Sequence, residues 1–492
     1  MIANTLHRNI TFLYNFLSKH YKANPFTRHM NTSDNLLSFN RNGKLLFYLD
    51  RTYVREIFDD PTPKDLIQVS GWVKSIRSAC KGTLLFIDFT DSTTILPLQI
   101  AVSNTIPNFG QVKNLTMGSS VSFIGKLSTE PTLELKLESE DSGHKFHIYN
   151  KIDNSDNYPI AKQALSVDYI RSFPHLRART RFGSSIIHAR SELINLTHKY
   201  FKNKKFTHIT TPIITTMDAE GAGCQFKITP GNFFGTPTYL AVSGQLALEV
   251  LTCSVGDTYT LGPTFRAENS NTTRHLSEFW MLEVECSFAQ LNDIITIAED
   301  YIKYVAKQMM QTEWIKYLDE YNGDVIQRLS ELINNEVIVV SFDECMEIIK
   351  NNYNGQTVGS INISRDDERV LIEHFGNKLI AITHFPSVNR PFYMKRTNSG
   401  KSTFSFDIIA PEVGEIVGGS ERETNYQRLV KQMEEQKMNV ECYKKYLDMR
   451  IFGSIPHGGF GIGIERLLMF LTGVKNIRDV IPFPRMISHA EF

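Results

Sequence analysis

A short polar stretch between two apolar runs carries the densest set of side chains that could bind phosphate. Arg266 and Glu268 stand at its start, and Arg274 and His275 follow within ten positions. An Arg side chain can make two parallel charge-assisted hydrogen bonds to a phosphate. Phe279, on the next apolar run, could stack on a nucleotide base. The pattern predicts a site for a bent nucleoside triphosphate; the alternative is a solvated charged turn beside a buried Phe.

Two carboxylates on a later apolar stretch form a second group. Asp407 and Glu415 are eight positions apart, and Gly418, Gly419 and Arg422 follow. Magnesium in nucleotide sites binds one or two carboxylates and completes its shell with phosphate oxygens and water. Glycine lets the backbone approach a ligand closely. The spacing predicts that Asp407 and Glu415 hold Mg²⁺ beside the triphosphate, while Arg422 reaches the other end of the substrate.

Regular patterns indicate the elements that must position these residues. The apolar runs around the polar stretch predict the two strands of a hairpin. Helical spacing of apolar residues predicts helices over 293–310, 314–340 and 360–377. Nearer the N-terminus, five short segments with turn signals between them predict a small barrel: IQVSGWV, LLFIDFTD, LPLQIAV, VSFIGKL and LELKLE.

Length and composition bound the class of protein. The 492 residues suffice for two or three domains, and 41% hydrophobic with 22% charged residues is ordinary for a globular chain. Because the formal net charge is zero, any surface that binds nucleic acid must be local. The six Cys are scattered without a CxxC pair, which fits a reducing compartment. No apolar run reaches the length of a membrane span, so no membrane association is expected.

The N-terminal stretch differs from the rest of the chain. Residues 1–33 contain no Asp or Glu, hold four Lys or Arg, and place Leu6, Ile10, Leu13 and Leu17 at helical spacing. An acid-free, basic, amphipathic start is typical of a mitochondrial transit peptide. We therefore expect the mature protein in the mitochondrial matrix; the alternative is a plain N-terminal helix or disordered tail.

Several of these stretches, in the same order, resemble the motifs of one enzyme family. FRAENSNTTRHLSEF is similar to motif 2 of class II aminoacyl-tRNA synthetases, and GGFGIGIER is similar to motif 3. The basic helical lead-in after Tyr169 and the strand ending at Pro212 resemble motif 1. RHLSEFWMLEVE is similar to the asparaginyl branch of the aspartyl, asparaginyl and lysyl subgroup. The resemblance covers about residues 60 to 492.

This resemblance implies an α+β fold, in which an all-β OB-fold barrel precedes an antiparallel-sheet class II catalytic domain. The implied domains are a transit peptide and lead-in at 1–60, an anticodon-binding barrel at 61–150, a linker or hinge at 151–175 and the catalytic domain at 176–492. In the family motif 1 forms the dimer interface, so a homodimer is expected.

The family also implies roles for the matching residues. Those implied to bind ATP are Arg266, Glu268, Arg274, His275, Leu276, Phe279, Asp407, Glu415, Gly463 and Arg466. Arg266 and Arg466 are the implied catalytic pair, because they would stabilise charge that develops on the phosphates. Those implied to bind the amino acid are Glu220, Gln245, Glu249 and Arg422.

The barrel segments resemble the anticodon-binding domain of the same subgroup. On that resemblance, Phe86 stacks on an anticodon base, Gln99 reads a base edge and Arg77 contacts a phosphate or base. The alternative for Phe86 is a place in the core of the barrel. Alternation along its strand must put Phe86 on the outer face for the first interpretation to hold.

The implied reaction is ATP-dependent ligation of asparagine to its cognate tRNA through an aminoacyl-adenylate. Aspartyl enzymes carry a Lys three residues after the matching Gln, whereas Gln245 here is followed by Leu246, Ala247 and Leu248. Glu249 comes next and is expected to accept from the substrate amide. Two alternatives remain: an aspartyl-tRNA synthetase, and a non-catalytic tRNA-binding relative, which would require damaged motifs.

Overall fold

The computed structural model describes residues 51–491, except 154–157, 161–164, 220–223, 229–232, 353–362 and 389. The chain divides into two compact units, 1–161 and 162–492. The predicted transit peptide and the implied substrate ligand Glu220 lie outside the described residues. No helix in the described part of the chain is long and apolar enough to cross a membrane.

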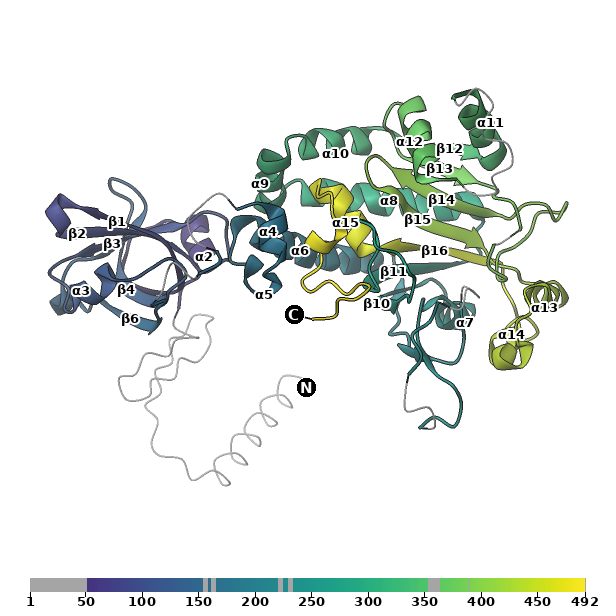
Figure 1. The fold of residues 1–492 in the computed structure, drawn as a ribbon, viewed down its shortest axis with the longest axis horizontal. Coiled ribbons are helices and arrows are strands. Elements are labelled where there is room, and N and C mark those ends of the chain that lie inside the picture. The colour runs from purple at the N-terminus through teal and green to yellow at the C-terminus, as the bar shows by residue number, and fades with distance from the viewer. Residues whose placement is uncertain are drawn as a thin grey trace, which may run out of the picture. The chain divides into compact units, whose positions relative to one another are not determined.

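The first unit is a closed barrel (Figure 1). Side chains along its strands alternate between core and solvent, as on β2. Its helices are α2 (Val54–Asp59) and α3 (Phe109–Lys113), and its strands are β1 (Lys64–Ala79), β2 (Leu84–Thr90), β3 (Leu98–Ser103), β4 (Ser120–Ser128), β5 (Glu134–Leu137) and β6 (Lys145–Asn150). The strand order is β1-β2-β3-β5-β4-β6, and a further pairing of the long β1 with β4 closes the barrel. The predicted small barrel of OB-fold type is therefore confirmed.

Two elements of this unit add to the five predicted strands. Strand β6 pairs antiparallel with β4 outside the closed ring. Helix α2 buries Val54 and Ile57 completely in the barrel core, although the sequence placed this segment in the lead-in. Apolar side chains at one short helix are enough to join it to a neighbouring core, and nothing in its sequence marks that packing.

The second unit is built on an eight-stranded, mostly antiparallel sheet of order β12-β13-β14-β15-β16-β11-β10-β7. In chain order its strands are β7 (Thr207–His208), β10 (Thr258–Phe265), β11 (Glu278–Ser287), β12 (Ile338–Ser341), β13 (Ile380–Thr383), β14 (Ser405–Ala410), β15 (Gly414–Glu421) and β16 (His457–Gly463). Strands β8 (Ile214–Thr215) and β9 (Tyr239–Leu240) form a separate pair. The predicted α+β class is confirmed.

Helices cover one face of this sheet and flank its ends (Figure 1). They are α4 (Val167–Arg171), α5 (Pro174–Arg177), α6 (Arg181–Asn203), α7 (Gln245–Val255), α8 (Leu291–Met309), α9 (Glu313–Asn322), α10 (Val325–Asn334), α11 (Phe342–Asn352), α12 (Arg365–His374), α13 (Tyr426–Glu435), α14 (Lys444–Asp448) and α15 (Ile464–Thr472). A capping box between Gln290 and Asp293 begins α8, and its apolar stripe, including Ile294 and Ile302, is fully buried. Helix α4 is tied down by two 2.7 Å hydrogen bonds from Arg171 to Asp479.

The prediction of helix over 314–340 is wrong at its C-terminal end. Residues 338–341 form strand β12, which pairs in parallel with β13 at the edge of the sheet. Ile338, Val339 and Val340 are β-branched, and such side chains favour a pleated, half-buried surface over a helix. Of the helix predicted over 360–377, residues 365–374 form α12, and the described residues directly before and after them are not helical.

Candidate active site

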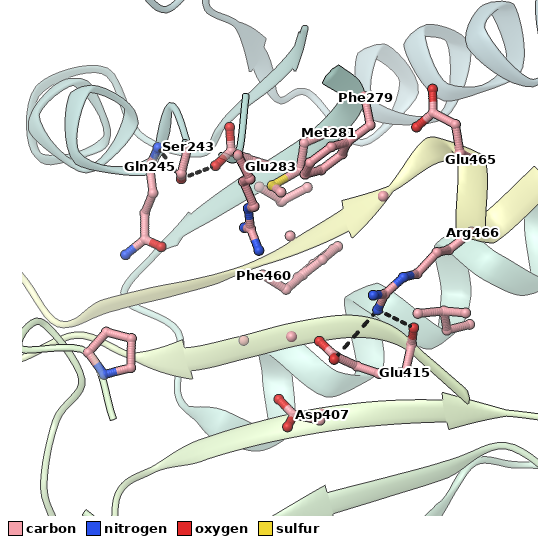
Figure 2. Close-up of a pocket in the computed structure, with 18 of the residues that line it drawn as sticks. Ser243, Gln245, Phe279, Met281, Glu283, Asp407, Glu415, Phe460, Glu465 and Arg466 are labelled. Atoms are coloured by element: carbon pink, nitrogen blue, oxygen red, sulfur yellow. Dashed lines mark hydrogen bonds and ion pairs between the residues drawn. The ribbon is translucent and has the colours of Figure 1, made fainter. Parts of the chain in front are cut away.

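The antiparallel sheet carries a cavity of about 410 Å³ on the face opposite the long helices. Figure 2 shows side chains from β11, β15, β16 and the start of α7 and α15 converging on it. Twelve of the implied ligands line it: Gln245, Arg266, Glu268, Arg274, His275, Leu276, Phe279, Asp407, Glu415, Arg422, Gly463 and Arg466. Stretches more than 200 positions apart in the sequence are thus brought to one site.

The predicted hairpin places an Arg beside an aromatic ring. Strands β10 and β11 pair so that Thr264 lies opposite Phe279, and the Arg266 backbone N–H closes the loop on Ser277 O at 2.9 Å. The Arg266 guanidinium carbon lies 5.5 Å from the centre of the Phe279 ring. A base stacked on that ring would therefore have a guanidinium at its edge, where the phosphates of the same nucleotide could reach it.

The loop of the hairpin holds a neutral His between cations. Nδ1 of His275 lies 2.6 Å from the Thr272 hydroxyl. Burial, and next the charge of Arg466, lower the pKa of His275, so the ring is uncharged near neutral pH. Arg274 is fixed by a 2.6 Å hydrogen bond to Glu412 O and lies 3.5 Å from Glu368. His275 can thus donate one hydrogen bond to a phosphate, while Arg274 supplies the charge.

Asp407 and Glu415 lie on the adjacent strands β14 and β15 and flank one glycine. A Cβ added at Gly418 would stand 3.3 Å from Glu415 Oε1 and 3.6 Å from Asp407 Oδ1. Burial, and next the charge of Glu415, raise the pKa of Asp407 to about 7. Arg466 reaches the same place, with Nη1 3.6 Å from a Glu415 carboxylate oxygen. Arg390 lies 3.7 Å from Asp407. A pair of carboxylates that faces a phosphate site fits the predicted Mg²⁺ ligands.

No group of three or more His, Cys, Asp or Glu side chains in the described residues is arranged to hold a metal ion. A magnesium ion held by Asp407 and Glu415 would therefore take its remaining ligands from phosphate oxygens and water.

At the other end of the cavity Arg422 forms a buried ion pair that the sequence did not predict. Its Nε and Nη2 each donate to a different carboxylate oxygen of Glu285 at 2.9 Å, and Nη1 donates to the Ser420 hydroxyl at 2.8 Å. Arg422 is 3% exposed and Glu285 is 1% exposed, yet both line the cavity. A guanidinium has five N–H groups, so donors remain on Nη1 and Nη2 for a ligand.

The expectation that Glu249 contacts the substrate amide differs from the structure. Glu249 is fully buried and does not line the cavity. Its carboxylate accepts from Arg450 at 2.6 Å, from the Tyr446 hydroxyl at 2.7 Å and from Gln245 at 2.9 Å. At four residues beyond Gln245 on helix α7, its side chain lies behind the cavity wall. Two other acidic side chains line the cavity here: Glu283, which accepts from the Ser243 hydroxyl, and Glu285, which is paired with Arg422.

The barrel brings its three implied tRNA ligands together on one face. Leu85 and Ile87 are buried in the core, and Phe86 between them points the other way and is partly exposed. The Arg77 guanidinium carbon lies 5.1 Å from the centre of the Phe86 ring, and Arg77 donates to Gln99 Oε1 at 2.6 Å. The strand alternation that the anticodon interpretation requires is therefore present.

Comparison with known proteins decides the family. The family described as tRNA synthetases class II (D, K and N) matches residues 166–487. Asparagine--tRNA ligase from Idiomarina loihiensis is 36% identical over 452 residues, which are 87% of this chain and 96% of that protein. The chain belongs to the class II tRNA synthetase family. The predicted family is thus confirmed.

Further relatives of this class II chain extend the comparison. Asparagine--tRNA ligase from Escherichia coli O157:H7 is 37% identical over 450 residues, covering 87% of this chain and 96% of that protein. The crystal structure of asparaginyl-tRNA synthetase from Pyrococcus horikoshii, complexed with asparaginyl-adenylate, has a TM-score of 0.80 at 28% identity and covers 90% of this chain and 99% of that chain.

Sequence reasoning missed three acidic partners in this class II chain. Glu285 pairs with Arg422, Glu368 lies beside Arg274, and Glu134 accepts from Gln99 Nε2 at 2.8 Å. Each is distant in sequence from the residue that it contacts. For Glu285 a signal existed, because a carboxylate that ends the apolar strand WMLEVE must find a buried cation.

Proposed function

We propose that the chain attaches asparagine to its cognate tRNA in two ATP-dependent steps. The observation that carries this choice is the Arg422–Glu285 pair at the closed end of the cavity. A side-chain carboxamide has a carbonyl oxygen to accept from Arg422 and an NH₂ group to donate to Glu285. An aspartate side chain would instead set its second oxygen against the Glu285 carboxylate.

Among the described residues that line the cavity there is no Lys, and Arg422 is already paired with Glu285. Leu248 and Gln245 also line the cavity, and the Lys that aspartyl enzymes carry is replaced by Leu248. An uncompensated buried charge costs several kcal/mol, about 3–5 when one partner of a buried pair is missing. That cost corresponds to a preference for asparagine of about a hundredfold or more. The asparagine--tRNA ligase relatives support the same substrate.

In the first step an oxygen of the amino-acid carboxylate attacks the α-phosphorus of ATP, and the bond to the β-phosphate oxygen breaks, releasing pyrophosphate. The step needs no nucleophilic side chain, so catalysis is positioning and charge stabilisation. Arg266, beside the Phe279 ring, would stabilise charge on the α-phosphate. Arg274 and Arg466, with neutral His275, would hold the β- and γ-phosphates.

In the second step a terminal ribose hydroxyl of tRNA loses its proton and attacks the acyl carbon, and the bond from that carbon to the phosphate oxygen breaks, so that AMP leaves. We assign the tRNA anticodon to the exposed face of the barrel around Phe86, with Arg77 and Gln99 beside it. An exposed ring suits an unpaired base, because every base offers a face for stacking.

Magnesium would be held by Asp407 and Glu415. When bound, it would neutralise charge on the β- and γ-phosphates. The crowding of these two carboxylates around Gly418 supports the assignment.

We further propose that two copies assemble through the segment around Pro212, and that residues 1–33 direct the chain to mitochondria. Ile213 and Ile214 are 43% and 44% exposed, and a second copy would cover them. If the chain does not form a dimer, light scattering on purified protein would give the mass of one copy.

The proposed transit peptide is tested by fusing residues 1–40 to a fluorescent reporter, which should give a mitochondrial signal. A diffuse cytosolic signal would refute the mitochondrial assignment.

The test of the function is ATP–pyrophosphate exchange with each proteinogenic amino acid in turn, followed by charging of total tRNA. Asparagine should give the fastest exchange and should be the residue found on tRNA. Faster exchange with another amino acid would mean that this amino acid, and not asparagine, is the substrate. No exchange with any amino acid would refute the proposed activity.

A further inference from the structure

A buried carboxylate lies directly behind the amino-acid end of the cavity. The two oxygens of Glu249 have different partners: Oε2 accepts from Arg450 Nη2 at 2.6 Å and from the Tyr446 hydroxyl at 2.7 Å and lies 3.2 Å from His457 Nε2, and Oε1 accepts from Gln245 Nε2 at 2.9 Å. Of these four partners Gln245 lines the cavity, whereas Arg450, Tyr446 and His457 do not. Glu249 therefore connects a buried cation to Gln245, and its other neighbour in the site is Arg422, whose Nε lies 4.0 Å from Oε1.

The charge of Glu249 decides which way the Gln245 amide faces. An ionised carboxylate can only accept hydrogen bonds, so the Gln245 NH₂ must face it and the carbonyl oxygen must face away. Figure 2 shows the Gln245 oxygen on the side toward Phe460. Burial opposes ionisation, but the hydrogen bond from His457 and the charge of Arg450 hold the pKa of Glu249 below its usual range.

The cavity thereby receives an acceptor, and the bound amino acid must supply a donor. Its side-chain amide has an acceptor of its own in Glu285. The remaining strong donor of an amino acid is its α-ammonium group. We infer that Glu249 and Arg450 are positioning residues, which hold Gln245 so that its carbonyl oxygen accepts from the substrate α-ammonium. This inference rests on the proposed function in requiring an amino acid in the cavity.

The test compares asparagine with succinamic acid, which is the same molecule without its α-amino group. The KM for asparagine and the inhibition constant of succinamic acid are measured in ATP–pyrophosphate exchange. In Glu249→Gln the new amide can donate or accept, so Gln245 loses its fixed orientation. We expect the KM for asparagine to rise about tenfold or more, because the substrate loses one hydrogen bond to its charged group. The succinamic acid constant should change much less, because Arg422 keeps its two hydrogen bonds to Glu285, and the KM for ATP should stay unchanged.

A matched control is present on helix α10. Gln327 donates to Glu331 at 3.0 Å with the same spacing of four residues, but the pair is exposed. Glu331→Gln should change neither constant. Because Glu249→Gln leaves Arg450 without its anion and could fail to fold, Gln245→Met is the second variant; it removes the acceptor without altering a buried charge.

The two positions should not act independently. Gln245→Met should raise the KM for asparagine and leave the inhibition constant of succinamic acid unchanged. Adding Glu249→Gln to Gln245→Met should not change the ratio of these two constants further. Arg450→Lys keeps the positive charge, so its ratio of the two constants should stay nearer to that of the parent protein than the ratio in Arg450→Met. Equal weakening of both ligands in Glu249→Gln, or an unchanged ratio in Gln245→Met, would overturn the inference.

The amino-acid specificity can fail separately. If exchange runs with aspartate and not asparagine, the same comparison with aspartate and succinate tests Gln245, and a selective loss for aspartate would support the positioning role while refuting asparagine as substrate.

Discussion

The guanidinium of Arg422 and the carboxylate of Glu285 face each other through two parallel hydrogen bonds, each 2.9 Å long, at the closed end of the cavity. Arg422 directly follows strand β15, so the pair joins the end of that strand to strand β11 across the glycine-rich strand β16, which lies between them in the sheet. A donor and an acceptor are thus presented side by side to whatever side chain enters. That arrangement matches a carboxamide better than a carboxylate or an apolar group.

Removing the charge of Glu285 should weaken discrimination against aspartate. In Glu285→Gln we expect the asparagine-to-aspartate ratio of kcat/KM to fall about tenfold or more, because an amide no longer repels the second carboxylate oxygen. Glu421→Gln is the control: Glu421 is also buried and ion-paired, at 2.6 Å from Lys395, but does not line the cavity. If both variants lower the ratio equally, Glu285 does not set specificity.

Arg266→Ala should abolish adenylate formation without unfolding the protein. Loss of one group that stabilises transition-state charge costs about 2.7–4 kcal/mol, or a hundredfold to a thousandfold in rate. Pyrophosphate exchange reports the rate, and thermal melting reports the fold. Arg369→Ala, which removes an exposed Arg paired with Glu373 on α12, should change neither. An Arg266→Ala protein with normal exchange would remove Arg266 from the reaction.

The exposed face of the barrel should serve tRNA and not ATP. Phe86→Ala should raise the KM for tRNA about tenfold, since stacking of one base on an aromatic ring contributes about 1–3 kcal/mol. Pyrophosphate exchange should be unchanged. Tyr149→Ala, at an exposed ring on β6, is the control and should leave both values alone. Equal loss of exchange and charging in Phe86→Ala would mean that Phe86 supports the fold.

Stability and magnesium binding should depend on pH through Asp407. Its pKa is raised to about 7 by burial and the charge of Glu415, whereas an unfolded Asp titrates near about 3.9. Between these values the folded state holds a proton that the unfolded chain has lost. The contribution of Asp407 therefore makes the ligand-free Tm fall as pH rises from about 5 to about 8.

Magnesium needs the ionised carboxylate, so affinity for Mg·ATP should rise over the same range. Asp407→Asn should flatten both trends, as measured by melting and by calorimetric titration. A Tm profile in Asp407→Asn that is identical to the parent profile would show that another group titrates.

The sequence predicted the ligands of the cavity better than their supports. Arg266, Asp407 and Arg466 could be found because each stands in a short stretch whose residue types already suit phosphate or magnesium. Glu249 was placed in contact with the substrate, because spacing along a helix gives the face of a residue only when the neighbours of that helix are known. Arg450, more than 200 positions away, takes up its carboxylate.

In the fold, too, features set by a short stretch of sequence could be predicted, and features set by distant segments could not. Alternation along LLFIDFTD was enough to place Phe86 outside the barrel and Leu85 within it. The strand β12 was missed because its short apolar run follows a helical pattern, and pairing with β13 over residues 338–341 comes from chain more than 40 positions later. Pairing between distant segments overrides local preference.

Direct competition between asparagine and aspartate for charging tests the central claim. The purified protein is given both amino acids at equal concentration with ATP, Mg²⁺ and total tRNA, and the aminoacyl group recovered from tRNA is identified by mass. The Arg422–Glu285 pair predicts asparaginyl-tRNA in about hundredfold or greater excess. A product that is mainly aspartyl-tRNA would contradict the account.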